Sequence, residues 1–337
     1  MNRENNIIIQ KNKEFWKKKL SDKEYEVLVE GGTERACHNE YYNNKRQGIY
    51  ICAACNNRLF SSSEKYHSGS GWPSFYDVMS EKAVGTRKDR SLGMERTELY
   101  CNRCGGHLGH VFKDGPEPTG LRYCINSNSL NFLQEAYFSM GCFWKPEALF
   151  ASLEGVFFTE VGYAGGEKEN PTYHDLGNHA ETVHVIYDPD IIDYDELLEI
   201  FWENHNPYRE AVSSQYRSLI LYNTDEHKSV AGKFIQAKGK TQIEQNKDIQ
   251  TRVCMIDIFT AAEEYHQKYL LKSNQKLYER LSALYDSKDE LNKSRPAAKL
   301  NAYSGEFLDK GDIKEELRNH YLYVKYNNQL EEIISEL

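Results

Sequence analysis

Hydrophobic and polar residues follow two different rhythms along this chain of 337 residues. Over residues 14–30, apolar residues recur at helical spacing, which predicts one or two short helices that end at Gly31 and Gly32. Over residues 48–132, short β-prone runs alternate with turns rich in Gly, Ser, Pro and Asp. This second pattern predicts a compact antiparallel β domain with few helices.

From residue 135 onward, predicted strands alternate with predicted helices. A strand over residues 136–140 leads through a turn at Gly141 and Cys142 into a helix over residues 143–153. Alternation of this kind indicates an α/β layer fold. We expect further strands over residues 182–187 and 216–222, further helices over residues 194–202 and 225–237, and an amphipathic helical tail over residues 312–337.

The pattern divides the chain into three parts: a β domain over residues 12–133, an α/β domain over residues 134–305 and a helical tail over residues 306–337. The length is sufficient for two compact domains. No linker rich in Pro, Gly or Ser separates them near Leu133, so we expect the two domains to abut.

Composition excludes several classes of protein. The formal net charge of -9 and a pI near 5.7 argue against nucleic acid as a partner. No apolar run approaches the roughly 20 residues that span a bilayer, so no membrane partner is expected. The first ten residues lack the features of a secretory signal. We therefore expect a cytoplasmic, reducing location, with thiols free or bound to metal.

Four of the eight cysteines form two pairs with the same spacing, Cys52 with Cys55 and Cys101 with Cys104. This pattern predicts one structural Zn²⁺ per chain, bound by four thiolates. A catalytic zinc is disfavoured because four thiolates leave no open position. A thioredoxin-like redox motif is disfavoured by the β context. A zinc-ribbon binding module is compatible with the pairs alone, but the acidic charge argues against it.

Cys124 stands outside the pairs, in a predicted strand. A lone strand cysteine is usually a small buried hydrophobic residue. Here the neighbouring Arg122 can lower the thiol pKa, His107 and His110 can donate protons, and Trp72 can line an apolar pocket. The two histidines are also potential metal ligands, but the zinc already has four better ones.

The region over residues 14–132 resembles the B-type methionine sulfoxide reductases. The resemblance implies a zinc-bearing β-sandwich in which Cys124 is the nucleophile. It also implies that Trp72 contacts the substrate methyl, with His107, His110 and Asn126 around the sulfoxide oxygen and its bound water. It rests on Gly71-Trp72-Pro73-Ser74-Phe75, His107-Leu108-Gly109-His110-Val111-Phe112, Asp114-Gly115-Pro116 and Arg122-Tyr123-Cys124-Ile125-Asn126-Ser127.

One position departs from that family. Many relatives have a cysteine that resolves the oxidised nucleophile where this chain has Ser70. Cys37, in the N-terminal segment, is the alternative resolving thiol, and direct reduction by an external thiol is the competing hypothesis.

Cys142 lies at a predicted strand-to-helix turn, followed by Phe143 and Trp144. Amides at a helix N-terminus stabilise a thiolate, and the two aromatic residues can form an apolar wall. A cysteine that merely caps the helix is the competing interpretation of this local pattern.

The region over residues 135–304 resembles the A-type methionine sulfoxide reductases, a two-layer α/β sandwich with a ferredoxin-like core. The resemblance implies Cys142 as nucleophile and Phe143 with Trp144 around the methyl group. It further implies that Glu181, Tyr173 and Tyr216 bind and protonate the sulfoxide oxygen. It rests on Gly162-Tyr163-Ala164-Gly165-Gly166, Pro171-Thr172-Tyr173, His179-Ala180-Glu181, Phe201-Trp202-Glu203-Asn204-His205, Gln215-Tyr216-Arg217-Ser218 and Ala262-Glu263-Glu264-Tyr265-His266-Gln267.

This half departs from the common A-type pattern too. Lys145 and Pro146 stand where small residues are usual, the segments before Glu181 and Gln215 are short, and no Gly-Asn-Asp stretch supplies an active-site Asp. No cysteine follows His266, so the usual resolving thiols are missing. These features resemble a short-loop branch of the family, and Cys254 is interpreted as a packing residue.

We therefore predict a fusion that reduces methionine sulfoxide, free or in peptides and proteins, to methionine. The N-terminal domain is expected to take the R epimer and the C-terminal domain the S epimer. Thioredoxin or another thiol is the expected reductant. The competing hypotheses are a redox sensor or zinc-dependent binding module without turnover, and a fusion with only one active half.

Overall fold

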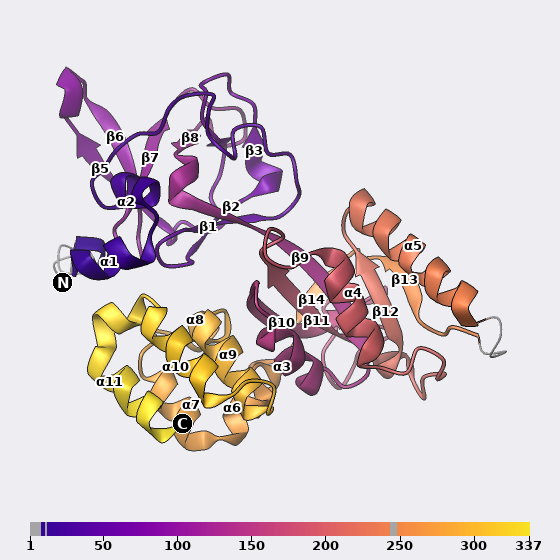
Figure 1. Ribbon diagram of the computed structural model, residues 1–337. Helices are drawn as coiled ribbons and strands as arrows, with labels where there is room; N and C mark the ends of the chain where they lie inside the picture. Colours follow the sequence, from indigo (N-terminus) through magenta and orange to yellow (C-terminus); the bar gives the residue numbers. More distant parts are fainter. Residues whose placement is uncertain (1–7, 11, 243–247) are drawn as a thin grey trace. The chain divides into compact units, whose positions relative to one another are not determined.

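The computed structural model describes residues 8–10, 12–242 and 248–337 (Figure 1). Two compact units are present: Met1–Leu133 with Asn319–Asn327, and Gln134–Arg318 with Asn328–Leu337. Within the described residues, no helix is both long and apolar enough to cross a membrane. Of the N-terminal segment used to argue against a secretory signal, residues 1–7 lie outside the described part.

The first unit begins with two short helices, α1 (Lys13–Lys19) and α2 (Asp22–Leu28). Helix α2 starts at a capping box in which Ser21 and Glu24 satisfy each other's backbone N–H groups. Trp16 of α1 and Leu28 of α2 are buried. The two helices predicted over residues 14–30 are confirmed.

A six-stranded sheet follows, in the order β3-β4-β8-β7-β6-β5, and every pairing in it is antiparallel. Its register places Cys124 of β8 opposite Ser74 of β4 and His110 of β7. The strands are β3 (Lys65–Tyr66), β4 (Ser74–Phe75), β5 (Val84–Asp89), β6 (Arg96–Cys101), β7 (His107–Phe112) and β8 (Arg122–Ile125).

Strands β1 (Ile49–Cys52) and β2 (Arg58–Ser61) form a second antiparallel group in this unit, in which β1 also pairs with the first residues of β9 (Leu130–Met140). Phe60 of β2 stacks on Phe75 of β4 with ring centroids 4.4 Å apart, and Tyr50 contacts Phe75 at 5.1 Å. These three buried rings join the two groups of strands into one core.

The second unit contains a mixed sheet in the order β13-β12-β9-β11-β10-β14. Only the pairing of β12 with β13 is parallel among those described. Helices α3 (Trp144–Ser152), α4 (Tyr194–Glu203) and α5 (Asp225–Gln242) alternate with these strands along the sequence. The strands besides β9 are β10 (Val156–Ala164), β11 (Ala180–Tyr187), β12 (Ser218–Tyr222), β13 (Arg252–Met255) and β14 (Phe259–Ala261).

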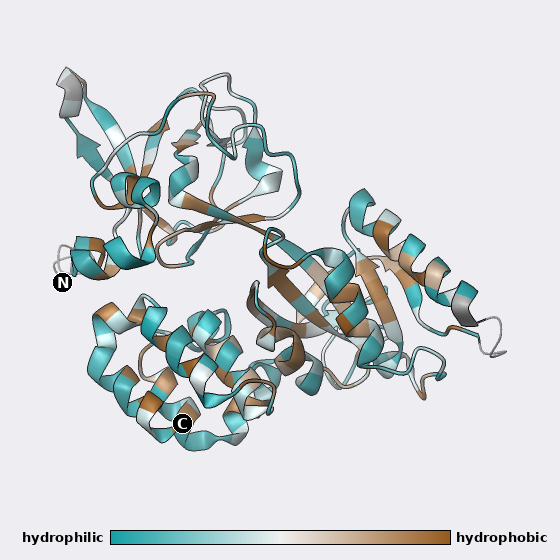
Figure 2. Cartoon of the chain, viewed as in Figure 1, coloured by the Kyte–Doolittle hydropathy of each residue, from teal (hydrophilic) through white to brown (hydrophobic). Residues whose placement is uncertain are grey.

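Aromatic residues fill the core between this sheet and its helices. Phe138 of β9 stacks on Phe150 of α3 at 5.0 Å and on Phe201 of α4 at 5.2 Å. Every residue of β11 is buried, and the strands of this sheet are largely brown in Figure 2. The predicted alternation of strands and helices is confirmed, and β10 and β14 are additional strands that the pattern did not indicate.

Short helices make up the C-terminal region. Helix α9 packs against α3 and α6, and α11 contains a non-helical residue at Tyr326. The helical tail predicted over residues 312–337 is confirmed, with this break. The helices are α6 (Tyr269–Ser273), α7 (Gln275–Ser282), α8 (Lys288–Asn292), α9 (Arg295–Ser304), α10 (Lys310–Asn319) and α11 (Leu322–Glu336). Single 3-10 turns occur at Ile8–Gln10, Ser62–Glu64, Ser91–Gly93, Ser127–Ser129, Ser214–Tyr216 and Glu264–His266.

A buried ion pair fixes the start of this region. Lys268, just before α6, donates from Nζ to Glu147 Oε1 of α3 over 2.6 Å, and both side chains are fully or almost fully buried. Lys268 Nζ also donates to the carbonyl of Thr159 at 2.7 Å. The charges are thus paired and hydrogen-bonded, as buried charges must be.

Candidate metal centre and two candidate active sites

The four paired cysteines meet at one point in the first unit. Cys52 ends β1 and Cys101 ends β6, so each pair occupies the turn after a strand. All four sulfur atoms lie within 4.8 Å of one another and are fully buried. The Sγ atoms are 3.7 Å apart for Cys52 and Cys104 and 3.6 Å apart for Cys55 and Cys101.

These distances fit a tetrahedral metal. With zinc–sulfur bonds of about 2.3 Å, the sulfur atoms of a tetrahedral site are about 3.8 Å apart. Two donors also face the sulfurs: Asn57 Nδ2 lies 3.6 Å from Cys101 Sγ, and the Gly106 N–H lies 3.4 Å from Cys104 Sγ. The four cysteines can therefore bind a metal such as zinc.

Cys124 lies half-buried on β8 beside Ser70, whose hydroxyl oxygen is 3.8 Å from Cys124 Sγ. Burial raises the pKa of the Cys124 thiol above its usual value, although the Ser70 hydroxyl and the Arg122 charge oppose the shift. Arg122 therefore lowers this pKa as expected, but burial has the larger effect and the net shift is upward. Arg122 also donates two hydrogen bonds of 2.9 Å to Asp114.

Trp72 and Asn126 are held through Glu34, a residue that no motif indicated. Trp72 Nε1 donates to the Glu34 carbonyl at 3.2 Å, and the Glu34 N–H donates to Asn126 Oδ1 at 3.3 Å. Asn126 Nδ2 donates in turn to the Leu108 carbonyl at 3.1 Å. Glu34 thus connects the predicted methyl platform to a predicted oxygen-binding residue.

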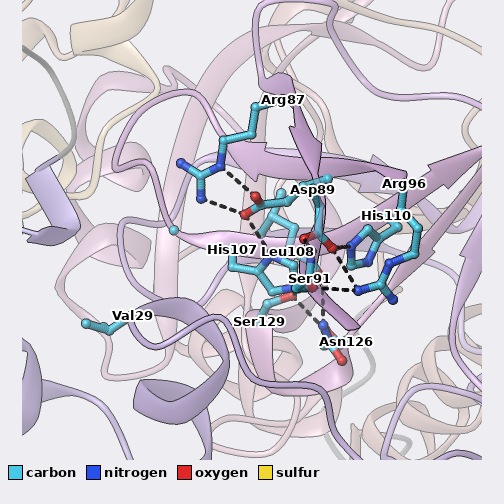
Figure 3. A network of polar contacts seen from close by, with 12 residues as sticks. Val29, Arg87, Asp89, Ser91, Arg96, His107, Leu108, His110, Asn126 and Ser129 are labelled. Carbon is cyan, nitrogen blue, oxygen red and sulfur yellow. Dashed lines mark hydrogen bonds and ion pairs between the residues drawn. The ribbon is translucent and has the colours of Figure 1, made fainter. Parts of the chain in front are cut away.

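Both predicted histidines of this site contact carboxylates (Figure 3). His107 Nδ1 lies 2.9 Å from Glu98 Oε1, and His110 Nε2 lies 2.8 Å from Asp89 Oδ2. Burial alone would raise the pKa of Glu98, but hydrogen bonds from His107 and Arg87 reverse this and lower the pKa to about 2. Burial lowers the pKa of His110.

Cys37 is exposed and approaches the site from the N-terminal segment. Its backbone N–H donates to the Gly71 carbonyl at 2.7 Å. A Cβ atom added at Gly71 would lie only 3.1 Å from Cys37 Sγ. Gly71 directly follows Ser70, whose hydroxyl contacts Cys124. Cys37 therefore contacts the residue next to that serine.

In the second unit, Cys142 lies exposed at the turn before α3. Burial of the thiol by surrounding protein raises its pKa, while a hydrogen bond from the Trp144 N–H lowers it and the charge of Glu181 raises it further. The helix N-terminus therefore lowers the pKa of the Cys142 thiol, as predicted, but burial has the larger effect.

Glu181 on β11 is 2% exposed, and both of its carboxylate oxygens accept a hydrogen bond. The Phe143 N–H donates to Oε2 at 3.0 Å, and Gln215 Nε2 donates to Oε1 at 2.7 Å. Burial raises the pKa of Glu181 despite these two donors. Gln215 belongs to a recognised motif, but nothing in the sequence assigned it to this carboxylate.

Aromatic residues surround the same site. Trp144 stacks on Tyr269 with ring centroids 3.6 Å apart, and its Nε1 donates to His266 Nδ1 at 3.3 Å. Phe143 is buried against His266, with ring centroids 5.3 Å apart. Tyr269 and His266 are thus additional members of the wall that Phe143 and Trp144 were predicted to form.

Tyr173 and Tyr216 are the other two residues, besides Glu181, that were predicted to bind the sulfoxide oxygen. Glu263 accepts hydrogen bonds from the Tyr173 N–H at 3.0 Å and from the Tyr163 hydroxyl at 2.7 Å, which orders the Tyr173 segment. Tyr216 is 37% exposed. Its pKa is raised by burial and then by the charge of Glu181, which indicates that this hydroxyl lies near the carboxylate.

Cys254 lies on β13 and packs against a small hydrophobic cluster that includes Tyr137, Leu219 and Leu221. This position agrees with its interpretation as a packing residue.

Two family models match the chain. The SelR domain matches residues 20–134, and the peptide methionine sulfoxide reductase family matches residues 134–299. A protein named peptide methionine sulfoxide reductase MsrB, from Leptospira interrogans, is 56% identical over 130 residues, which cover 39% of this chain and 99% of that protein. The chain belongs to the methionine sulfoxide reductases. It joins a B-type domain to an A-type domain, and reduces both the R and the S epimer of methionine sulfoxide.

Other similar proteins match one half of this reductase each. MsrB of Methanosarcina mazei is 57% identical over 127 residues, 38% of this chain and 91% of that protein. The solved structure of methionine sulfoxide reductase A of Corynebacterium diphtheriae is 31% identical and covers 42% of this chain and 76% of that one, with a TM-score of 0.40. Reduced Mxr1 of Saccharomyces cerevisiae is 28% identical, with coverages of 42% and 87% and a TM-score of 0.38.

Proposed function

We propose that the two domains act as independent reductases, with Cys124 as the nucleophile for the R epimer and Cys142 as the nucleophile for the S epimer. The observation that carries this proposal is that each thiol lies in the same unit as its own candidate proton donors. His107 and His110 lie in the unit that holds Cys124, and Glu181 lies in the unit that holds Cys142.

The chemistry at Cys142 follows from the environment of Glu181. A sulfoxide sulfur is a poor electrophile until its oxygen is protonated or strongly hydrogen-bonded. A buried carboxylic acid with a raised pKa can supply that proton near neutral pH. Tyr173 and Tyr216 hold the oxygen, while Phe143 and Trp144 contact the methyl group.

The oxygen then moves from one sulfur to the other. As the Cys142 thiolate reacts with the protonated sulfoxide, a bond forms between Cys142 Sγ and the oxygen, the bond between the substrate sulfur and that oxygen breaks, and methionine leaves with the electron pair of the broken bond. Cys142 is oxidised to a sulfenic acid, the first step of cysteine oxidation. The same balance applies at Cys124, where Trp72 contacts the methyl and His107, His110 and Asn126 surround the oxygen and its water.

A thiol must reduce each sulfenic acid before the next turnover. We propose thioredoxin or a similar dithiol as the final reductant. For Cys124, the position of Cys37 beside Gly71 supports an internal disulfide as the first reduction step. Direct attack by an external thiol is the competing route, and it is the one we propose for Cys142.

The remaining parts of the proposal concern the scaffold. One structural zinc on the four paired cysteines stabilises a B-type β-sandwich over residues 12–133. The A-type domain, over residues 134–305, has a ferredoxin-like core, and residues 306–337 form a helical tail. A cytoplasmic location is proposed on composition alone.

Separate assays on the R and S epimers, with Cys124→Ser and Cys142→Ser, test this function. We expect each substitution to abolish reduction of one epimer and to spare the other. Loss of both activities in one variant would contradict independent sites. Retention of R reduction in Cys124→Ser, or of S reduction in Cys142→Ser, would remove that cysteine as a nucleophile. An unmodified chain active on one epimer only would identify an inactive half.

A further inference from the structure

His107 and His110 each contact a carboxylate that is in turn bound by an arginine (Figure 3). Arg87 donates two hydrogen bonds of 2.6 Å to Glu98, which contacts His107. Arg96 donates to Asp89 at 2.7 Å, and Asp89 contacts His110. The carboxylates and arginines all come from strands β5 and β6.

The two carboxylates contact different nitrogens of their rings. Glu98 contacts Nδ1 of His107, whereas Asp89 contacts Nε2 of His110. An ionised carboxylate only accepts hydrogen bonds, so the ring nitrogen that faces it must carry the proton. Both carboxylates are ionised, because hydrogen bonds lower the pKa of Glu98 to about 2 and bring that of Asp89 lower still. The neutral rings are therefore opposite tautomers.

The nitrogen of His107 that is not used by Glu98 is left for a ligand. His107 is 5% exposed, and its Nε2 atom is buried without a hydrogen-bond partner among the described residues. Buried polar atoms are normally paired, so an unpaired one marks a place where a ligand or a water binds. His110 has its Nε2 occupied and presents the other side of its ring.

We propose that Glu98 is a positioning residue of the B-type site, which holds the proton on His107 Nδ1 and so makes Nε2 the atom that meets the sulfoxide oxygen or its water. Arg87 fixes the Glu98 carboxylate through a bidentate hydrogen bond. The fixed carboxylate sets the orientation of the His107 ring as well as its tautomer. Asp89 holds the proton on Nε2 of His110, the opposite nitrogen, so the two histidines are not interchangeable. This inference rests on the proposed reaction at Cys124.

The first test measures the tautomers directly. Ring nitrogen chemical shifts of ¹⁵N-labelled full-length protein distinguish a protonated from an unprotonated Nδ1. We expect neutral His107 to carry its proton on Nδ1 and neutral His110 on Nε2, with signals assigned by His107→Ala and His110→Ala. The same tautomer on both rings, or the reverse assignment, would overturn the proposal.

The second test measures catalysis in Glu98→Gln. An amide of the same size keeps the packing but removes the charge, and it can offer His107 either a donor or an acceptor. We expect kcat for the R epimer to fall about 10-fold to 100-fold, with a smaller change in KM. This is the loss seen when groups that hydrogen-bond to metal-ligating histidines are removed. Reduction of the S epimer by the same chain is the internal control.

Glu95 provides a matched control on the same hairpin. Among the described residues, it forms surface ion pairs with Lys88 at 3.4 Å and Arg90 at 3.5 Å, and its side chain is 60% exposed. Glu95→Gln should leave both activities unchanged. Unchanged R reduction in Glu98→Gln would overturn the inference while leaving the nucleophile intact, whereas R reduction that survives Cys124→Ser would overturn the proposed function itself. If Glu98→Gln fails to fold, the tautomers of the unmodified protein decide.

Discussion

The backbone N–H of Phe143 donates a hydrogen bond to Glu181 Oε2 over 3.0 Å, so the proposed acid is anchored to the residue that follows its nucleophile. Gln215 Nε2 donates to the other oxygen over 2.7 Å. Both donors favour the charged carboxylate, while burial favours the neutral acid, and burial has the larger effect. The balance between these opposing effects determines the pH range in which Cys142 can work.

Glu181→Gln should abolish most S-epimer reduction and leave R-epimer reduction unchanged. Loss of a general acid costs roughly 100-fold to 10,000-fold in rate. In the unmodified protein the acid form of Glu181 is the active one, so S reduction should fall as pH rises through the raised pKa of this group. Steady-state rates for each epimer across pH check both statements. Full S activity in Glu181→Gln would exclude this carboxyl as the acid.

Gln215→Met tests the second donor. Methionine has a similar length but cannot donate to Oε1, so the charged form of Glu181 loses support and its pKa should rise further. The descending limb of the S-epimer pH profile should move to higher pH, by about one unit for a hydrogen bond to a charged group. An unmoved limb with a normal fold would show that Gln215 does not tune this acid.

Cys37→Ser should slow thioredoxin-dependent turnover of the R epimer without slowing the first turnover, because only the resolving step is lost. Ser70→Cys supplies a matched rescue, since the Ser70 hydroxyl already lies 3.8 Å from Cys124 Sγ. We expect the double variant Cys37→Ser, Ser70→Cys to recover steady-state turnover. Disulfide mapping after one turnover checks the assignment, and a persistent sulfenic acid on Cys124 with Cys37 untouched would contradict it.

Removal of the metal should unfold the first domain preferentially. Cys101→Ser leaves three thiolates, and structural zinc sites contribute directly to folding free energy. We expect R-epimer reduction and the bound zinc to be lost together, while S-epimer reduction continues. Metal analysis, circular dichroism and the two epimer assays on the same sample check this. A folded, R-active protein without metal would refute a structural zinc.

Lys268→Met should destabilise the A-type domain by about 3–5 kcal/mol, because it leaves the carboxylate of Glu147 buried and unpaired. Urea unfolding followed by S-epimer activity measures the change. The double variant Glu147→Met, Lys268→Met removes both charges and should recover most of the loss. Equal stability of the single and double variants would show that the ion pair is not what anchors this region.

Local sequence patterns predicted the elements that carry the two proposed nucleophiles, but not the residues that support them. The turn at Cys142 and the strand of Cys124 follow from local spacing and turn residues. Glu34 and Tyr269 lie in segments whose approach to the sites depends on tertiary packing. Glu98 reaches His107 only because β6 pairs with β7. No local spacing encodes such contacts.

Local sequence patterns also failed to predict the net pKa shifts of the two thiols. Arg122 and the helix N-terminus are local signals, and both act to lower a thiol pKa. Burial is set by the whole fold, and it raises the pKa of Cys124 and of Cys142.

The stack of Tyr269 on Trp144 covers one face of the indole. In the proposed site, the substrate methyl meets the face that Tyr269 does not cover, while the oxygen meets Glu181 and the peptide chain points to solvent. Three substituents of a tetrahedral sulfur are then assigned to three fixed directions, which is the minimum needed to tell a chiral centre from its mirror image. In the proposed site, the side of the Trp144 ring that is covered therefore sets the handedness of the reaction.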